Sequence, residues 1–479
     1  MIDGIVSLYT RSYPDTLIYM LQSTEYEITP YLKWYWRTGN FKTVAKRRTL
    51  EKTTAARLLL LALRTGIISQ VVVGLLFVVL GARSHMLASV QLGVALLISY
   101  PVIWAHAVVL PLFAGDLFIR RPQHRRHIAH SRKLFREHKA VKIAVAGSYG
   151  KTTMKELLTT VLSEGKRVAS TPGNKNVSIS HAAFARRLKG DEDILVIEYG
   201  EGKPGDVKRF AAITKPDIAM ITGVAPAHLD HYKTTSAAAK DIFSLAAVVP
   251  AEKVYVNGES PDAKSHTKPS QQAYSQKGVG EWKVSDISVA IDGTAFVMKK
   301  GKQVLRLQSK LIGAHQVGPL AAVAALADSL GLSKEQIEAG VAKTAPYEHR
   351  MQPYQLSRAW VIDDTYNGNI EGMRAGLAVL HDLSAKHKIY ITPGLVEQGP
   401  ENEAVHTRLG ELIAAAKPDK VVLMKNSVTD WIAASMKKHH FHGELVLEDD
   451  PKRFYTNLDQ FVAAGDLVVM QNDWTDNYN

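Results

Sequence analysis

The chain of 479 residues contains no cysteine. Without cysteine it cannot form a disulfide, a thiolate zinc site or a cysteine nucleophile, and nothing in its composition argues for an oxidising compartment. The sequence also has no internal repeat of fixed short period and no low-complexity linker. A chain of this length therefore has to build two or three domains, each around an ordinary hydrophobic core.

Acidic residues are scarce in the first 140 positions. This segment holds 19 Lys and Arg against 7 Asp and Glu, whereas the remaining 339 residues hold 40 against 39. Of the formal net charge of +13, the N-terminal segment therefore carries +12 and the rest of the chain +1. Such a basic segment attracts nucleic acid or anionic lipid. Because long apolar stretches lie beside the basic clusters, we expect membrane lipid as the partner and no nucleic acid.

Residues 1–55 combine nine aromatic residues with a basic run at 42–52. Rings with one polar edge, next to cations, suit a membrane interface. A small helical cap with solvated charges explains the same pattern equally well. We therefore expect a cytoplasmic or interfacial segment here, with the choice between the two left open.

Two apolar stretches follow, Thr65–Ala82 and Met86–Ala114, and neither contains Asp, Glu, Lys or Arg. Only three residues separate them, and about 20 apolar residues suffice for a helix to cross a bilayer. Two buried helices of a soluble domain are the alternative, but such helices seldom run so far without charge. We predict a transmembrane hairpin within residues 56–140.

The charged flanks of the hairpin predict its orientation. Arg57 and Arg64 precede the first stretch, and eight basic residues follow the second. By the positive-inside rule both ends lie in the cytoplasm, so we expect a two-span protein of the cytoplasmic membrane with the rest of the chain in the cytoplasm. The eight are Arg120, Arg121, Arg125, Arg126, Arg132, Lys133, Arg136 and Lys139.

The stretch 143–153 predicts a buried strand, a glycine-bracketed turn and a helix start, which together form a phosphate loop. Gly147 and Gly150 allow backbone amides to approach a triphosphate, Lys151 would reach its outer phosphates, and the Thr152 hydroxyl would hold Mg²⁺. The alternative is a glycine-rich turn that merely precedes Lys and Thr, since the strict motif has glycine where Val145 stands. The candidate loop residues are Gly147, Ser148, Gly150, Lys151, Thr152 and Thr153.

From residue 141 onward, short apolar runs alternate with helical patterns, which predicts two α/β domains at 141–345 and 346–479. In the first we expect a mostly parallel sheet, then a small antiparallel excursion within 258–312 and an apolar helix at 317–330. The first domain should bind ATP and the second resembles a Rossmann-type unit. The expected strands are 143–146, 193–197, 218–222, 254–257, 360–363, 388–392, 420–424, 444–447 and 467–470.

Three further residues are candidates for metal chemistry. Glu198 ends a predicted strand one strand away from the phosphate loop, which suits a Mg²⁺ ligand, although a helix cap or a surface acid fits too. His228 lies in a loop with a second histidine and an acid, where most histidines are simply exposed. Lys240 interrupts an otherwise apolar helix, where a lysine usually extends to solvent.

Seven blocks of the sequence resemble the Mur ligase family, and within it the MurF ligases, in order and in spacing. The resemblance covers residues 141–479 and implies the Mur-type middle and C-terminal domains. The blocks are GSYGKTT (147–153), VIEYG (196–200), ITGVAPAHLDHY (221–232), AAAKDIF (237–243), GAHQVGPLAAVAA (313–325), His349 with Arg350, and IDDTYNGNIEGM (362–373).

The resemblance implies an ATP-dependent, ADP-forming ligase of peptidoglycan precursor synthesis. Such an enzyme transfers the γ-phosphoryl group of ATP to a substrate carboxylate, and an amine then attacks the acyl phosphate. The implied carboxylate belongs to a muramyl peptide, and the implied amine is D-alanyl-D-alanine or a related compound. The implied cofactors are ATP and Mg²⁺, of which two ions are expected.

Site residues follow from the resemblance by position. Lys151 and the loop glycines would hold the phosphates, and Thr152 with Glu198 would hold one Mg²⁺. His228 would hold a second Mg²⁺, together with Lys240 as an anionic carbamate. Arg350 would reach the ATP phosphates from the C-terminal domain, and catalysis would require the two domains to close on each other.

The remaining implied residues line the nucleotide and the substrates. His315 and Gln316 belong to the adenine side, and the acid at Asp363 or Asp364 would line the nucleotide with Asn367. The implied substrate-side residues are Asn174, Asn176, Tyr366 and Asn369.

The sequence departs from the family in places that bear on the substrate. The UDP-sugar-binding domain of the family is not recognisable, so a lipid-linked acceptor becomes an option. Pro319 stands where the family has an adenine-side Asn, and Gln471 stands where it has Lys. Two alternatives therefore stay open: a membrane-anchored ATP-binding scaffold or regulator without ligase activity, and a Mur-type ligase acting on a non-murein carboxylate.

Overall fold

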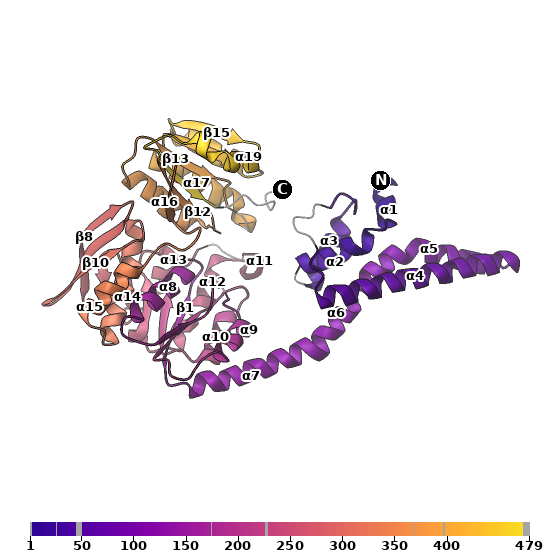
Figure 1. Cartoon of the computed structure of the whole chain (residues 1–479), viewed down its shortest axis with the longest axis horizontal. Helices are drawn as coiled ribbons and strands as arrows, with labels where there is room; N and C mark the ends of the chain where they lie inside the picture. The colour runs from indigo at the N-terminus through magenta and orange to yellow at the C-terminus, as the bar shows by residue number, and fades with distance from the viewer. Residues whose placement is uncertain are drawn as a thin grey trace. The chain divides into compact units, whose positions relative to one another are not determined.

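The computed structural model describes residues 2–24, 26–44, 50–173, 175–225, 229–366, 368–395 and 398–472. The chain forms two compact units, Met1–Arg126 and His127–Asn479. Both are drawn in Figure 1.

The described residues of the first unit form helices and connecting loops without a strand, and its two longest helices run alongside each other as a hairpin (Figure 1). The three residues between those helices form the tight connection that the sequence predicts. The elements are α1 (Ile2–Leu8), α2 (Tyr13–Ser23), α3 (Ile28–Arg37), α4 (Thr54–Arg83), α5 (Leu87–Ala107), α6 (Val109–Gly115), a π-helical turn (Asp116–Arg120) and the start of α7 (Arg121–Glu137).

Small residues let α4 and α5 approach closely. A Cβ added to Gly93 would lie 2.6 Å from the Gly74 carbonyl oxygen, so the two backbones touch there. The polar residue of this seam, Gln70, is satisfied inside the hairpin: its Nε2 donates to the Leu96 carbonyl at 3.0 Å, and Trp104 Nε1 donates to its Oε1 at 2.8 Å. The hairpin therefore satisfies this polar side chain without water.

Helices α2 and α3 pack on one end of the hairpin. Tyr13 and Tyr31 are fully buried there, and their hydroxyls donate to the carbonyls of Pro101 (2.9 Å) and Ala105 (3.0 Å). Arg64 pairs with Asp15 across the same junction at 2.8 Å. The aromatic segment thus forms a helical cap, whereas much of the basic run, residues 45–49, lies outside the described residues.

Beyond the cap, the hairpin leaves large apolar side chains uncovered. Ile68 is 63% exposed and Ile98 is 61% exposed. Two helices, Thr54–Arg83 and the continuous run Leu87–Glu137, are long and apolar enough to cross a membrane, and only 17% and 22% of their most apolar windows are buried. A core helix of a soluble domain is mostly buried, whereas these two windows are mostly exposed among the described residues.

The first sheet of the second unit has its strands in the order β10-β9-β8-β7-β6-β5-β4-β1-β3-β2. Its β2 to β6 half is parallel and its β6 to β10 half is antiparallel, which confirms the predicted excursion. The strands are β1 (Val141–Ala146), β2 (Val168–Ser170), β3 (Ile194–Glu198), β4 (Ile218–Ile221), β5 (Val254–Asn257), β6 (Gln272–Ser275), β7 (Gly278–Val279), β8 (Trp282–Ala290), β9 (Gly293–Lys300) and β10 (Gln303–Ser309).

Helices cover both faces of the parallel half. On one face α8 (Lys151–Leu162), α14 (Val317–Ser329) and α15 (Lys334–Lys343) share one core with the strands. On the other face α9 (Ser178–Ala185), α10 (Asp206–Thr214) and α12 (Thr235–Ile242) share a second core, which also takes in Phe135 of α7. Two short helices, α11 (Leu229–Tyr232) and α13 (Pro261–His266), complete this domain.

The second sheet has the order β11-β12-β16-β13-β14-β15, with only β11 antiparallel. Helices α16 to α18 share one core and α19 with α20 another, so the predicted Rossmann-like layering is confirmed. The elements are β11 (Gln352–Leu356), β12 (Ala359–Asp364), α16 (Ile370–Asp382), β13 (Lys388–Thr392), α17 (Asn402–Ala416), β14 (Lys420–Met424), α18 (Thr429–Lys438), β15 (Glu444–Glu448), α19 (Pro451–Thr456), α20 (Leu458–Phe461) and β16 (Leu467–Gln471).

Candidate active site

The loop between β1 and α8 lies where ligands bind in open α/β sheets, at the carboxyl end of a strand with neighbours on both sides. Gly147 has φ +147°, and a Cβ there would lie 2.3 Å from Thr222 Oγ1. Gly150 has φ +73° and caps α8. Ser148 N donates to the Gly223 carbonyl at 2.8 Å. Both glycines are therefore required by the backbone, and the loop leads into the N-terminus of α8.

The loop lysine folds back onto its own loop. Lys151 Nζ donates to the Gly147 carbonyl at 2.5 Å and lies 2.8 Å from Glu201 Oε2. Glu201 is only 4% exposed, so this ion pair is buried. Sequence reasoning missed Glu201, whose signal was a second acid directly after the block that contains Glu198.

The Glu198 carboxylate, 1% exposed at the end of β3, lies beside the loop as predicted. Thr152 Oγ1 and Asn176 Nδ2 both donate to its Oε1 at 3.2 Å. Within the described part of the chain its Oε2 accepts no hydrogen bond, and Lys155 Nζ lies 3.5 Å away. A buried carboxylate with an unsatisfied oxygen next to a threonine hydroxyl fits a Mg²⁺ ligand set.

Two buried side chains that sequence reasoning missed support this carboxylate. Lys155 has no exposed surface, and its Nζ also donates to the Gly173 carbonyl. His181 Nε2 bonds the Glu198 carbonyl at 2.8 Å, and burial lowers the pKa of His181 to about 4. The imidazole is therefore neutral at pH 7 and donates from Nε2 to that carbonyl.

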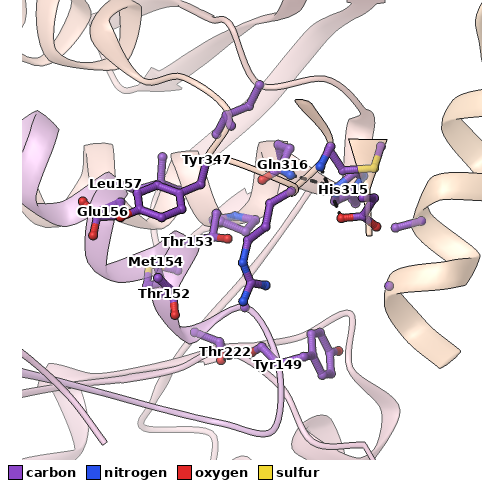
Figure 2. A pocket seen from close by; sticks show the side chains of 18 of the residues that line it. Tyr149, Thr152, Thr153, Met154, Glu156, Leu157, Thr222, His315, Gln316 and Tyr347 are labelled. Atoms are coloured by element: carbon purple, nitrogen blue, oxygen red, sulfur yellow. Dashed lines mark hydrogen bonds between the residues drawn. The ribbon is translucent and has the colours of Figure 1, made fainter. Parts of the chain in front are cut away.

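A cleft with walls from both sheets of this unit adjoins the loop. Figure 2 shows Thr152 and Thr153 of α8, Thr222 after β4, and His315 with Gln316 around the same cavity. The sequence-predicted residues that line it are Gly150, Thr152, Thr153, His315, Gln316, Arg350, Asp364, Tyr366 and Asn369.

Residues on the far wall come from the segment before β11 and from the end of β12. The Arg350 guanidinium carbon lies 4.4 Å from the centre of the Tyr366 ring. Asp364 is half-buried at the end of β12, and desolvation raises its pKa to about 6. Asp363 does not line the cleft, because its carboxylate pairs with His349 at 2.7 Å and accepts from Thr365 Oγ1 at 2.7 Å.

His315 and Gln316, which the resemblance places on the adenine side, both line the cleft, and their Nε2 atoms lie 2.8 Å apart. Burial, with a smaller contribution from the Arg374 charge, lowers the pKa of His315 to about 4, so this ring is neutral and accepts from the amide. Sequence reasoning did not find Asn257, Glu259 or Arg374, which line the same cleft from β5, its following loop and α16.

Asn369 lines the cleft but also has a local structural role, whereas Lys240 lies away from the cleft. Asn369 Oδ1 caps α16 by accepting from the Glu371 and Gly372 amides, both at 3.0 Å. Lys240 is exposed on α12, does not line the cleft, and has no hydrogen bond or ion pair within the described residues. Three of the predicted site residues lie outside the described residues, so their roles stay predictions. These are Asn174, His228 and Asn367.

Comparison with protein families matches the two sheets separately. Residues 145–327 match the Mur ligase middle domain, and residues 349–471 match the Mur ligase, glutamate ligase domain. Both matched segments line the cleft: the first contributes the phosphate loop, and the second contributes Arg350.

Similar curated proteins are UDP-N-acetylmuramoyl-tripeptide--D-alanyl-D-alanine ligases. The one from Escherichia coli (strain K12) is 27% identical over 316 residues, which are 64% of this chain and 69% of that protein. The one from Synechocystis sp. (strain ATCC 27184 / PCC 6803 / Kazusa) is 30% identical over 295 residues, 61% of this chain and 63% of that protein. The chain thus spans about two thirds of the length of these relatives.

Similar solved structures share the fold. The MurF ligase from Thermotoga maritima in complex with ADP superposes with a TM-score of 0.64 at 21% identity, over 73% of this chain and 80% of that one. MurF from Acinetobacter baumannii gives 0.64 at 21% identity, over 73% and 77%.

Proposed function

The chain belongs to the Mur ligase family through its middle and C-terminal domains, and on that premise we propose that it is an ATP-dependent, ADP-forming ligase of peptidoglycan precursor synthesis. The cleft carries the proposal, since the phosphate loop and Arg350 line it from opposite sides. Phosphoryl transfer depends on positioning and charge neutralisation more than on a protein nucleophile. The described site supplies both.

The proposed reaction has two steps. A substrate carboxylate oxygen attacks the γ-phosphorus of ATP and ADP leaves, which gives an acyl phosphate. The amine then attacks the acyl carbon, phosphate leaves and the amine loses a proton. The loop amides and the N-terminus of α8 hold the phosphates, while Lys151 and Arg350 neutralise charge from two directions. For this, Lys151 has to exchange Glu201 for a phosphate oxygen.

Magnesium is part of the proposal. Thr152 and Glu198 would hold one ion, which when bound neutralises phosphate charge, and the unsatisfied Glu198 oxygen supports this. His228 and a carbamylated Lys240 would hold a second ion. The exposed Lys240 side chain is accessible to CO₂. Its ammonium group first loses a proton, and the neutral amine then forms an N–C bond with CO₂ and releases a second proton, which turns the cation into an anionic ligand.

The carbamate is tested by Lys240→Ala, with Lys208→Ala on the exposed side of α10 as the matched control. We expect ADP release to fall by a factor of about 10² or more in the first variant, because a lost metal ligand removes transition-state charge stabilisation. The control should keep the parent rate. Unchanged turnover of Lys240→Ala would rule out the carbamate role.

We propose a muramyl peptide as the carboxylate substrate and D-alanyl-D-alanine or a related amine as its partner, which the names of the relatives support. Gln471 carries no charge at the position where the family has a lysine. The identity of the amine is therefore less well supported than that of the carboxylate. A screen of UDP-linked against lipid-linked muramyl peptides, read by mass spectrometry of the product, tests both. ATP binding without any ligated product would instead favour the alternative of an ATP-binding scaffold or regulator without ligase activity.

We also propose that α4 and α5 span the cytoplasmic membrane, with both ends in the cytoplasm and the basic flank against anionic headgroups. The uncovered apolar side chains and the length of the two helices support this. The full chain should need detergent for extraction, whereas a chain beginning at His127 should be soluble. A full chain that stays in the supernatant without detergent contradicts the two spans.

A further inference from the structure

Arg350 lies in a tight turn within the segment that joins the two catalytic domains. The Arg350 amide donates to the Tyr347 carbonyl at 3.0 Å, which closes the turn. The residues on either side of Arg350 both have positive φ, +58° at His349 and +49° at Met351. Residues other than glycine adopt this conformation at a cost, and it persists only where surrounding contacts enforce it.

The end of β12 supplies contacts to both of these residues, and Gln352 of β11 adds one, because its Oε1 accepts from the His349 amide at 3.3 Å. His349 Nδ1 lies 2.7 Å from Asp363 Oδ2, and the Tyr366 amide donates to the His349 carbonyl at 3.2 Å. On the other side, the Met351 amide donates to Asp364 Oδ1 at 3.2 Å. Two consecutive carboxylates therefore hold the two neighbours of Arg350.

The second carboxylate is itself fixed from the core of the C-terminal domain. Gln471 Nε2 donates to Asp364 Oδ2 at 2.7 Å and to the Gly372 carbonyl at 3.0 Å. The hydroxyl of Tyr390, a fully buried residue of β13, donates to Gln471 Oε1 at 3.0 Å. A continuous chain of hydrogen bonds thus runs from the sheet to the turn.

We propose that Asp363 and Asp364 are positioning residues for Arg350: they hold the turn in the conformation that presents the guanidinium to the γ-phosphate of ATP. For Asp363 this is a different role from lining the nucleotide, and Asp363 is not among the residues that line the cleft. The inference rests on the proposed function, since it requires a triphosphate in the cleft. It also explains why the strained backbone occurs in this linker.

The two roles of Asp363 predict different binding patterns. If it positions Arg350, its loss weakens the binding of a nucleotide with a γ-phosphate and spares ADP. If it contacts the base, the ribose or the inner phosphates, its loss weakens both nucleotides equally. The ratio of the two dissociation constants therefore separates positioning from direct contact, and an unchanged ADP affinity also reports that the variant is folded.

The experiment compares Asp363→Ala, Asp363→Asn and the exposed control Asp382→Ala in the full chain, by calorimetric titration with β,γ-methylene-ATP and with ADP. For Asp363→Ala we expect about tenfold weaker binding of the analogue and unchanged binding of ADP, as for one lost charged hydrogen bond. Asp363→Asn keeps one acceptor oxygen and should lose less affinity for the analogue than Asp363→Ala. The control should match the parent for both nucleotides.

A double-mutant cycle completes the test. In the background of Arg350→Ala, the Asp363→Ala change should have no further effect on analogue binding, because a positioning residue acts only through the residue it holds. Equal weakening of ADP and the analogue, or additive effects of the two changes, overturns the inference and leaves the ligase proposal intact. If the parent chain binds neither nucleotide, the proposed function itself fails.

Discussion

Alanine at Gly147 should destabilise the catalytic unit far more than alanine at Gly150, although both glycines bracket the same loop. A Cβ at Gly147 would lie 2.3 Å from Thr222 Oγ1 and 2.8 Å from the Gly223 carbonyl oxygen. The hydroxyl is held, because it donates to the Tyr149 carbonyl, and the second neighbour is backbone. Neither can move without shifting the end of β4.

The magnitudes follow from these contacts. At Gly147 the backbone strain costs about 1–3 kcal/mol and the overpacking about 1–3 kcal/mol, so the alanine should lower the free energy of unfolding by about 2–6 kcal/mol. At Gly150 a Cβ would lie 3.6 Å from Thr222 Cβ, which is ordinary contact. Alanine at position 150 therefore has to adopt only the left-handed backbone conformation, which lowers the free energy of unfolding by about 1–2 kcal/mol.

Urea denaturation of the parent and the two variants, without nucleotide and followed by tryptophan fluorescence, measures the difference. The transition midpoint should fall in both variants and fall further for Gly147→Ala, with an unchanged dependence on urea concentration. The interpretation of the loop is refuted if Gly147→Ala is as stable as the parent, or if Gly150→Ala is the more damaging change.

Three further outcomes are expected. The folded-state pKa of Asp364, about 6, lies above its ordinary value of 3.8, so the stability that this group contributes is present below pH 4 and is lost as the pH rises to 6. The free energy of unfolding of Asp364→Asn should therefore rise by about 3 kcal/mol relative to that of the parent between pH 4 and pH 7. Paired urea titrations measure this difference, and a difference that does not change with pH contradicts the reasoning. Glu201→Gln should lower the Kd for ADP about tenfold in calorimetry by releasing Lys151, and an unchanged or weaker affinity would show that the pair does not compete with phosphate. A chain beginning at residue 138 should unfold at a lower temperature than one beginning at His127, because it lacks the fully buried Phe135, which is worth about 3–5 kcal/mol; equal melting temperatures contradict that packing.

The order of strands and helices was accessible from the sequence because each element repeats its hydrophobic pattern locally. Short apolar runs such as 388–392 alternate with helical patterns, and a parallel sheet with helices on both faces is the usual arrangement of such a series. The phosphate loop was equally accessible, since its glycines, Lys151 and Thr152 are adjacent in the chain. Glu198 followed from its place at the end of a strand.

Contacts between distant segments were not accessible in this way. Lys155 reads as an ordinary helix residue, and only the fold buries it against Glu198. The acid at Asp363 or Asp364 was expected to line the nucleotide, and Asp364 does line the cleft, but both carboxylates also bind the turn around Arg350. Nothing local to either acid indicates that partner, because the turn belongs to the segment before β11.

The sequence by itself determined the two α/β domains, the phosphate loop and the apolar hairpin, because each depends on residues that are close in the chain and on a period that the side chains repeat. Only the tertiary structure decided which charges meet. The pairing of Lys151 with Glu201 and the positioning of Arg350 depend on where separate strands end in space. The pattern of residues along the chain does not contain the distances between those strand ends.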